Sequence, residues 1–289
     1  MALATLRDVL PTANREGRAV AGLVCLGWED AAAYVAAAEA VGAPVILQAG
    51  PGARAHTPLA VWGAIFRHLG EAARVPVVAH LDHGRSEDEC REALAHGFTS
   101  VMFDGSKLPD DENVARTAEV AAMARAAGAS VEGEIGFVGY ADGEVAAQLS
   151  NPTTPAQAAR LASEAGLDAV AVSVGNVHLK TVSDAVIDWE AVEAIAAATD
   201  APLVIHGASG VAEADRRRLA RGPVAKFNVG TELRQAFGRA LREAVAADPA
   251  RFDRIAILRE TMEPVREAAI AVIRALHAPD EAAGEALRG

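Results

Sequence analysis

The sequence predicts an α/β fold, a (β/α)8 TIM barrel with an additional C-terminal helix. Short runs of β-branched and other apolar residues alternate with alanine-rich segments along almost the whole chain. Most of these runs are continuously apolar, which is typical of parallel strands covered on both faces. Eight such strands, with eight intervening or following helices, form a barrel of this kind.

The eight strands are expected in the order in which the apolar runs occur. Their ranges are 20–27, 44–50, 76–82, 100–105, 130–136, 169–176, 203–209 and 224–231. Helices are expected between them, at 28–42, 58–73, 86–97, 109–127, 154–166, 188–199 and 212–221. The first of these helices has acidic residues in its first turn and Gly42 at its end, which suit the helix dipole and the C-terminal cap.

A last helix, at about 253–277, is expected to pack outside the barrel or against another subunit. Residues 1–289 are expected to form a single domain, with the barrel at about 18–250 and a C-terminal helical extension at about 251–289. The connection after Glu134 is longer than a usual strand-to-helix loop and contains three glycines. A mobile lid over the active face and an ordinary surface loop both remain open.

Charge and cysteine content limit the class of protein. The formal net charge of -12 argues against a nucleic-acid partner, although a metal and backbone amides still bind small anions locally. The two cysteines, Cys25 and Cys90, have no metal-ligand or disulfide spacing, which favours a cytoplasmic location. No apolar stretch approaches the ~20 residues of a membrane helix, so no membrane partner is expected.

Three histidines stand at the ends of predicted strands three, six and seven. They are His83, His178 and His206. Active sites of this fold gather at the carboxyl ends of the strands, so the three imidazoles are expected to converge. Three neutral nitrogen ligands leave coordination positions open, as a catalytic divalent metal requires.

Carboxylates accompany these histidines. Glu132 and Glu134 lie on one face of strand five, and Asp104 ends strand four. Buried carboxylates are costly without a cation or donors, so a metal ligand, a second metal position and a proton carrier all remain open. Asp82 directly precedes His83, and both side chains can reach the site where the strand ends. A salt bridge or a helix cap is the alternative for Asp82.

The last two strands end in glycine-containing turns suited to an anion. These are HGASG at 206–210 and NVGT at 228–231, with hydroxyls at Ser209 and Thr231. The loops after strands seven and eight commonly bind phosphate in this fold. Arg54, just after strand two, is either a further anion contact or a solvated surface charge.

Six segments together resemble the class II, metal-dependent fructose-bisphosphate and tagatose-bisphosphate aldolase family over nearly the whole chain. They are AHLDHG, GFTSVMFDGSKLPDDENVART, VEGEIG, AVSVGNVH, PLVIHGASG and VAKFNVGTEL. The resemblance implies that the three histidines bind a catalytic zinc and that Glu134 and Asp104 serve an alternative or second metal position. It implies that Asp82 exchanges a proton with the substrate oxygen and that a loop acid, Asp142 or Glu144, moves the carbon-bound proton.

The resemblance also implies a phosphate-binding set and an oligomer. The substrate-binding group would be Gly175, Gly207, Ser209, Asn228 and Thr231. A monovalent cation near the phosphate is common in the family, and its members are usually homodimers or homotetramers.

The chain departs from the family pattern where the substrate is positioned. Val24 and Gly27 stand where the family has asparagine and a polar residue, Gly50 where it has serine or threonine, and Leu179 where it has glycine. The resemblance therefore implies a lyase of carbohydrate metabolism that cleaves a non-standard ketose phosphate into dihydroxyacetone phosphate, or a close analogue, and an aldehyde. A metal-dependent sugar-phosphate isomerase or epimerase and a non-catalytic aldolase-like binding subunit are the alternatives.

Carbon–carbon cleavage needs an electron sink for the carbanion that it leaves behind. The chain has lysines at 107, 180 and 226, so their number alone leaves a Schiff-base route open. Three histidines with neighbouring acids suit a Lewis-acid metal better, and we expect the metal to be the sink.

Overall fold

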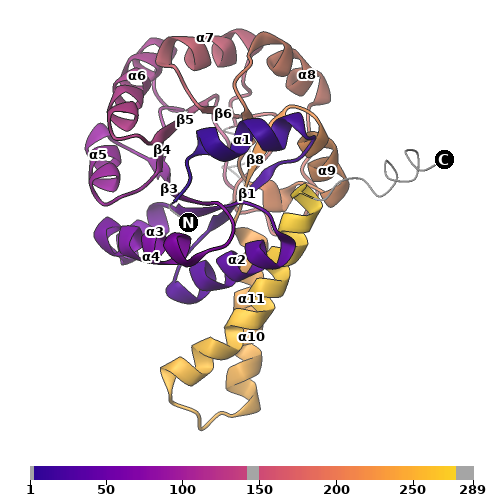
Figure 1. Cartoon of the computed structure of the whole chain (residues 1–289). Helices are drawn as coiled ribbons and strands as arrows, with labels where there is room; N and C mark the ends of the chain where they lie inside the picture. The colour runs from indigo at the N-terminus through magenta and orange to yellow at the C-terminus, as the bar shows by residue number, and fades with distance from the viewer. Residues whose placement is uncertain (1–2, 142–149, 278–289) are drawn as a thin grey trace, which may run out of the picture.

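The computed structural model describes residues 3–141 and 150–277, and within them eight parallel strands close into a barrel in sequence order (Figure 1). All eight strands begin within one residue of their predicted positions, which confirms the expected fold class. Their bounds are β1 Val20–Val24, β2 Val45–Ala49, β3 Val77–Gly84, β4 Ser100–Phe103, β5 Ser130–Ile135, β6 Ala169–Val172, β7 Leu203–Ile205 and β8 Val224–Val229.

The helices expected between the strands are present and form the outer layer of the barrel. They are α2 Trp28–Val41, α4 Leu59–Ala72, α5 Glu87–Ala95, α6 Asp110–Ala126, α7 Pro155–Ala165, α8 Trp189–Ala198 and α9 Glu213–Arg221, and the last helix is α11 Arg254–His277. Gly42 ends α2 in the left-handed conformation that the sequence suggested. Three further helices were not expected: α1 Leu6–Arg15, α3 Pro51–His56 and α10 Thr231–Ala247.

Helix α1 closes the amino end of the barrel. Its apolar residues Leu6, Val9 and Leu10 are buried against Ile46 and Val78 from the barrel interior. The helix has a sequence signal that could have revealed it, because Thr5 and Asp8 form a reciprocal capping box at its start. With this end closed, a substrate can enter the barrel only from the carboxyl ends of the strands.

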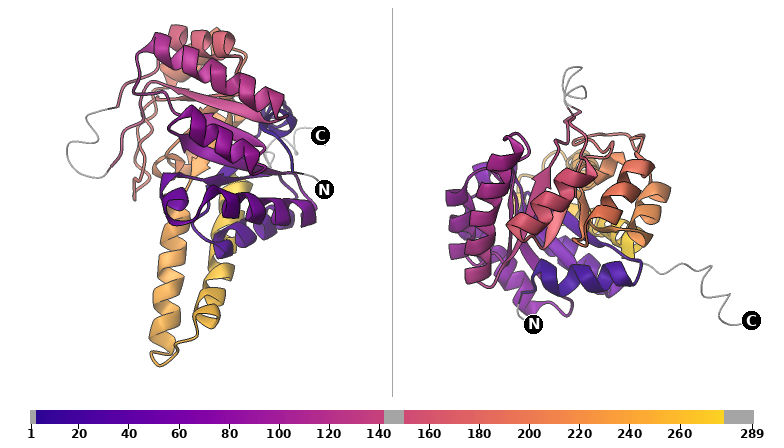
Figure 2. Two further views of the ribbon diagram at one scale, coloured as in Figure 1. Left: turned by 90° about the vertical axis from the view of Figure 1, so that its left-hand side faces the viewer. Right: turned by 90° about the horizontal axis from the view of Figure 1, so that it is seen from above.

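Helices α10 and α11 extend beyond the barrel as an antiparallel arm (Figures 1 and 2). The second half of the arm returns to the barrel, where α11 packs against α2. The connection at the tip includes Phe252, which is 94% exposed. Among the described residues, no helix combines the length and the apolar composition needed to cross a bilayer.

An ion pair occupies the interior of the barrel between β5 and β8. Lys226 Nζ lies 2.5 Å from Glu132 Oε2, and both side chains are fully buried. Lys226 Nζ also lies 3.3 Å from His80 Nε2, while His80 Nδ1 is 2.8 Å from Ser100 Oγ. The positive charge of Lys226 offsets the cost of burying the Glu132 carboxylate.

Replacing Lys226 with methionine is expected to destabilise the fold, because Glu132 is then buried without its counter-charge. The expected loss in the free energy of unfolding is roughly 3–5 kcal/mol, measured by urea denaturation. Lys180→Met is the matched control, since Lys180 pairs with Asp184, which is 63% exposed. The free energy of unfolding of that variant is expected to fall by no more than about 1 kcal/mol. Equal losses in the two variants would contradict the role of Lys226 as the counter-charge of Glu132.

Candidate active site and metal centre

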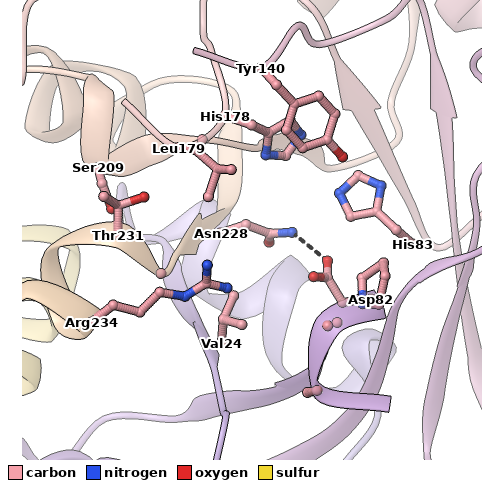
Figure 3. A pocket seen from close by; sticks show the side chains of 16 residues that line it. Val24, Asp82, His83, Tyr140, His178, Leu179, Ser209, Asn228, Thr231 and Arg234 are labelled. Carbon is pink, nitrogen blue, oxygen red and sulfur yellow. Dashed lines mark hydrogen bonds between the residues drawn. The ribbon is translucent and has the colours of Figure 1, made fainter. Parts of the chain in front are cut away.

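A pocket opens at the carboxyl ends of the barrel strands (Figure 3). The structure brings seven of the residues selected from the sequence to its wall. They are Asp82, His83, His178, Gly207, Ser209, Asn228 and Thr231. They follow β3, β6, β7 and β8 or lie at the ends of these strands, so barrel closure unites positions almost 150 residues apart in the chain.

The three histidines lie together beside this pocket: His83 and His178 line it, and the fully buried His206 is next to them. Ligand atoms of His83, His178 and His206 all lie within 4.8 Å of one another, and the ring centroids are 4.7–5.7 Å apart. His206 Nε2 lies 2.9 Å from Glu132 Oε1, whereas His206 Nδ1 is buried and has no hydrogen-bond partner among the described residues. This nitrogen lies 3.6 Å from Glu134 Oε2, beyond hydrogen-bond distance. A buried nitrogen without a hydrogen bond, beside two other imidazoles, fits a divalent metal with nitrogen ligands.

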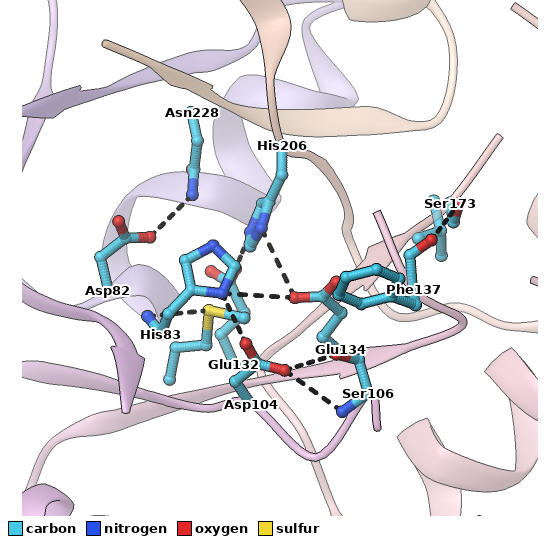
Figure 4. A network of polar contacts seen from close by, with 12 residues as sticks. Asp82, His83, Asp104, Ser106, Glu132, Glu134, Phe137, Ser173, His206 and Asn228 are labelled. Atoms are coloured by element: carbon cyan, nitrogen blue, oxygen red, sulfur yellow. Dashed lines mark hydrogen bonds and ion pairs between the residues drawn. The ribbon is translucent and has the colours of Figure 1, made fainter. Parts of the chain in front are cut away.

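A second group shares His83 with the first (Figure 4). His83 Nδ1 lies 2.8 Å from Asp104 Oδ2 and 3.5 Å from Glu134 Oε2. Glu134 Oε2 is buried and has no hydrogen-bond partner among the residues that the structure describes. These oxygens could hold a metal in an alternative position, as expected for Asp104 and Glu134.

Burial and neighbouring charges shift the pKa values of these groups. Burial opposes charge on His83, but Asp82, Asp104 and Glu134 together raise its pKa to about 9. Burial, reinforced by Asp104, raises the pKa of Glu134 to about 8. Burial, with charge repulsion from His83, holds the pKa of His178 and of His206 well below the usual value. Two of the three imidazoles are therefore kept neutral, as metal ligands must be.

Asp82 and His83 both face the pocket although they are neighbours on one strand. His83 has a left-handed backbone (φ 52°), and the pairing of β3 with β4 shifts register between Leu81 and Gly84. This irregularity breaks the alternation that would send neighbouring side chains to opposite faces. Asp82 Oδ1 accepts hydrogen bonds from Asn228 Nδ2 at 3.0 Å and Gln48 Nε2 at 3.3 Å.

Arg54 is not available to an anion, so the expectation of a substrate contact there is wrong. Its side chain is only 6% exposed and forms an ion pair with Glu89 at 2.7 Å. Its remaining nitrogens donate to the carbonyls of Ala49, Asp82 and His83. Arg54 thereby links the ends of β2 and β3 and stabilises the irregular backbone at Asp82 and His83.

The anion-binding turns lie on the opposite side of the pocket. Gly207 has a left-handed backbone (φ 62°), and a β-carbon at this position would lie only 2.3 Å from the Val177 carbonyl oxygen. Only glycine fits there. Helix α10 begins at Thr231, and its N-cap residue Gly230 has no side chain to cap it. The Glu232 amide donates to Ser209 Oγ at 3.3 Å, so the Ser209 hydroxyl lies at the start of this helix, where backbone amides favour an anion. Gly175 does not line the pocket. A β-carbon there would lie 2.0 Å from the Val186 carbonyl, so the glycine serves close backbone packing rather than substrate binding.

Several pocket residues were not selected from the sequence as contacts, and three of them have side chains or backbones that bear on the site. Tyr140 stacks on His178, Leu179 has a left-handed backbone (φ 57°), and Arg234 extends from α10. Arg234 follows Thr231 by three positions on the same helix, a spacing that would have placed both on one face had α10 been expected. Burial, followed by the charges of Asp104 and Glu134, raises the pKa of Tyr140 to about 12.

The three lysines lie outside the described wall of the pocket. Lys226 is buried beneath it with Glu132, Lys180 pairs with Asp184, and Lys107 lies over the ring of Phe137. A Schiff-base route therefore has no amine in this pocket. Asp142 and Glu144, the expected loop acids, fall in 142–149, outside the described residues.

The chain is similar to known proteins over nearly its whole length. It matches the family model "Fructose-bisphosphate aldolase class-II" over residues 4–281. It is 34% identical to the 6-phospho-5-dehydro-2-deoxy-D-gluconate aldolase of Shouchella clausii (strain KSM-K16), covering 99% of this chain and 98% of that protein. It is also 34% identical to the probable fructose-bisphosphate aldolase of Bacillus subtilis (strain 168), covering 98% and 100%.

A solved structure has the same architecture. The YdjI aldolase from Escherichia coli K12 superposes with a TM-score of 0.81 at 30% sequence identity, over 95% of this chain and 97% of that chain.

Removing a metal ligand is expected to abolish tight metal binding while the barrel persists. For His206→Ala, metal analysis and titration of chelator-treated protein should show a large loss of metal affinity. The loss should exceed the roughly 10–100-fold decrease that follows from removing a hydrogen-bond partner of a metal ligand. In the wild type, metal addition should raise the melting temperature by linkage. His96→Ala, at the end of α5, is the control and should bind metal normally. Unchanged metal binding by His206→Ala would contradict the site.

Proposed function

The chain belongs to the class II fructose-bisphosphate aldolase family, and from this premise we propose that it cleaves a phosphorylated ketose into dihydroxyacetone phosphate, or a close analogue, and an aldehyde. The family is one of metal-dependent lyases. The observation that carries the proposal is the convergence of His83, His178 and His206, with the first two and Asp82 on the wall of one pocket. The reaction is a reversible retro-aldol cleavage.

The three histidines would hold the metal, which we propose to be Zn²⁺ because the ligand set offers three imidazole nitrogens. When bound, the ion would supply Lewis acidity at the ketone carbonyl of the substrate. Glu132 supports this role by engaging His206 Nε2, which leaves Nδ1 directed to the site. Asp104 and Glu134 would serve the alternative metal position.

Asp82 is proposed to accept the hydroxyl proton of the carbon that becomes the aldehyde. The proton moves to the carboxylate, the adjacent carbon–carbon bond breaks, and its electron pair flows toward the ketone oxygen. In the direction of synthesis Asp82 returns the proton. Because Asn228 and Gln48 both donate to Oδ1, the other oxygen is left for the substrate. A β-carbon at Gly50 would lie 3.1 Å from that oxygen, so the glycine leaves space there.

The phosphate is proposed to bind Gly207, Ser209, Asn228 and the start of α10 at Thr231, with a monovalent cation nearby. In the described part of the chain, Arg234 is the one arginine or lysine of the pocket wall, and its side chain has no ion pair or hydrogen bond. We propose that it contacts an anionic group of the substrate, the role that Arg54 does not fill.

The rest of the wall favours a substrate other than the standard bisphosphates. Val24 and Gly50 place apolar or small groups where the family has polar side chains, and Leu179 places a larger apolar group where the family has glycine. The similar proteins include both a deoxygluconate-phosphate aldolase and fructose-bisphosphate aldolases, so the family alone leaves the aldehyde half open. A loop acid, Asp142 or Glu144, is proposed to move the carbon-bound proton.

A homodimer or homotetramer is proposed from the arm. Phe252 and Ile255 at its tip are 94% and 68% exposed, and exposed apolar groups of this kind are typical of interfaces. A cytoplasmic location is proposed because Cys25 and Cys90 are both buried free thiols.

The proposal is tested by screening phosphorylated ketoses, including deoxy analogues, for released triose phosphate. Wild-type protein should cleave at least one of them, and a chelator should abolish the activity until metal is restored. Asp82→Asn should lower kcat by roughly 10²–10⁴-fold, the usual contribution of a positioned acid or base, and still bind metal. Full activity in the metal-free protein would exclude the mechanism.

Arg234→Gln is expected to raise KM for the cleaved ketose by about tenfold and to change kcat little, because a charge-assisted contact to the bound anion is lost. Arg239→Gln on the same helix is the control, since Arg239 does not line the catalytic pocket. Steady-state kinetics of both variants provide the measurement. Identical KM values would show that Arg234 does not touch the substrate.

The double variant Phe252→Ser/Ile255→Ser is expected to have a smaller mass in solution than the wild type, because it removes the apolar surface of the arm tip. Sedimentation velocity measures this change. Val186→Ser, at a valine that is 84% exposed on a barrel loop, should leave the mass unaltered. An arm variant with wild-type mass would argue against assembly through the tip.

A further inference from the structure

Tyr140 is fixed against one of the metal-binding histidines. Its ring stacks on the imidazole of His178, with centroids 4.7 Å apart and planes inclined by 21°. Two backbone hydrogen bonds hold the segments together: His178 N donates to Gly139 O at 2.8 Å, and Ala141 N donates to His178 O at 2.9 Å. The ring therefore has a defined position immediately beside the predicted metal centre.

The hydroxyl of Tyr140 faces the catalytic pocket. The residue lines the pocket, and its hydroxyl end points toward His83 (Figure 3). This hydroxyl has no hydrogen bond to any residue that the structure describes. A phenol can donate one hydrogen bond and accept others, so this capacity is available to a bound molecule.

A phenol is neutral near pH 7, since its ordinary pKa is about 10, and in this form it donates a hydrogen bond. A phenylalanine would provide the same stacked ring without a polar atom, so the contact with His178 does not explain the hydroxyl. The group is thus a donor in the pocket, on the side of His83 and next to His178.

We propose that Tyr140 is a further substrate-contacting residue, whose hydroxyl donates a hydrogen bond to the ketone oxygen while its ring orients His178. The inference rests on the proposed function. Negative charge develops on that oxygen as the carbon–carbon bond breaks, so the hydrogen bond strengthens in the transition state. The proton stays on Tyr140, and the electron pair of the broken bond remains on the substrate.

Two substitutions separate the hydroxyl from the ring. Tyr140→Phe keeps the stacked ring and should lower kcat roughly 10²–10³-fold, the usual effect of losing one such donor, with little change in KM. Its metal affinity, measured by titrating chelator-treated protein, should equal that of the wild type. Tyr140→Leu also removes the stacking and should weaken metal binding by roughly 10–100-fold, the usual cost of losing a group that orients a ligand.

The only other tyrosine provides a matched control. The Tyr34 hydroxyl donates to the Val24 carbonyl and does not line the catalytic pocket, so Tyr34→Phe should keep the wild-type kcat and metal affinity. A wild-type kcat in Tyr140→Phe would overturn the substrate contact, and so would a loss of metal affinity in that variant. Wild-type metal affinity in Tyr140→Leu would overturn the role of the ring.

These outcomes are distinct from failure of the proposed function. If the wild type cleaves no phosphorylated ketose in the presence of metal, the aldolase assignment fails. The metal titrations of Tyr140→Phe and Tyr140→Leu then still decide whether the ring orients His178.

Discussion

The hydrogen bond between Glu132 and His206 is the interaction on which the site depends. It engages Nε2 of the imidazole and leaves Nδ1 directed toward the other two histidines. Glu132 can stay in the barrel interior because Lys226 lies 2.5 Å away on β8. A buried ion pair contributes little net stability by itself, but here it supports a ligand in one orientation. The charge balance of the core and the geometry of the pocket are therefore coupled.

A second constraint acts at the end of β3. Placing the neighbours Asp82 and His83 in one pocket requires a left-handed residue and a register shift. Such backbone conformations are unfavourable for a residue with a side chain and persist where the surroundings hold them. Arg54 provides that support through the carbonyls of both residues. Arg54, which the sequence offered as a substrate contact, thus holds the backbone of Asp82 and His83 in place.

The pocket is divided chemically. Around the histidines it is polar, with Asp82, Asn228 and Tyr140 directed inward, and the turns at Gly207 and Thr231 suit an anion. Near β1 and β2 it is apolar or small, at Val24 and Gly50. This division is consistent with retained chemistry at the donor end of the substrate and an altered aldehyde end. Arg234 adds a positive charge to the wall of this pocket.

The sequence by itself determined the strands, most helices and the convergence of the three histidines. Apolar runs mark buried parallel strands, and closure of the barrel brings the carboxyl ends of all eight strands to one end of the molecule. Helix α10 was missed because it begins directly after strand β8, and no capping side chain marks its first residue. Only the tertiary structure decided which arginine is available, since Arg54 and Arg234 look alike in sequence and differ in their partners. It also decided that Tyr140 covers His178 and that Gly175 packs on backbone, because these contacts join residues whose proximity depends on how distant loops fold.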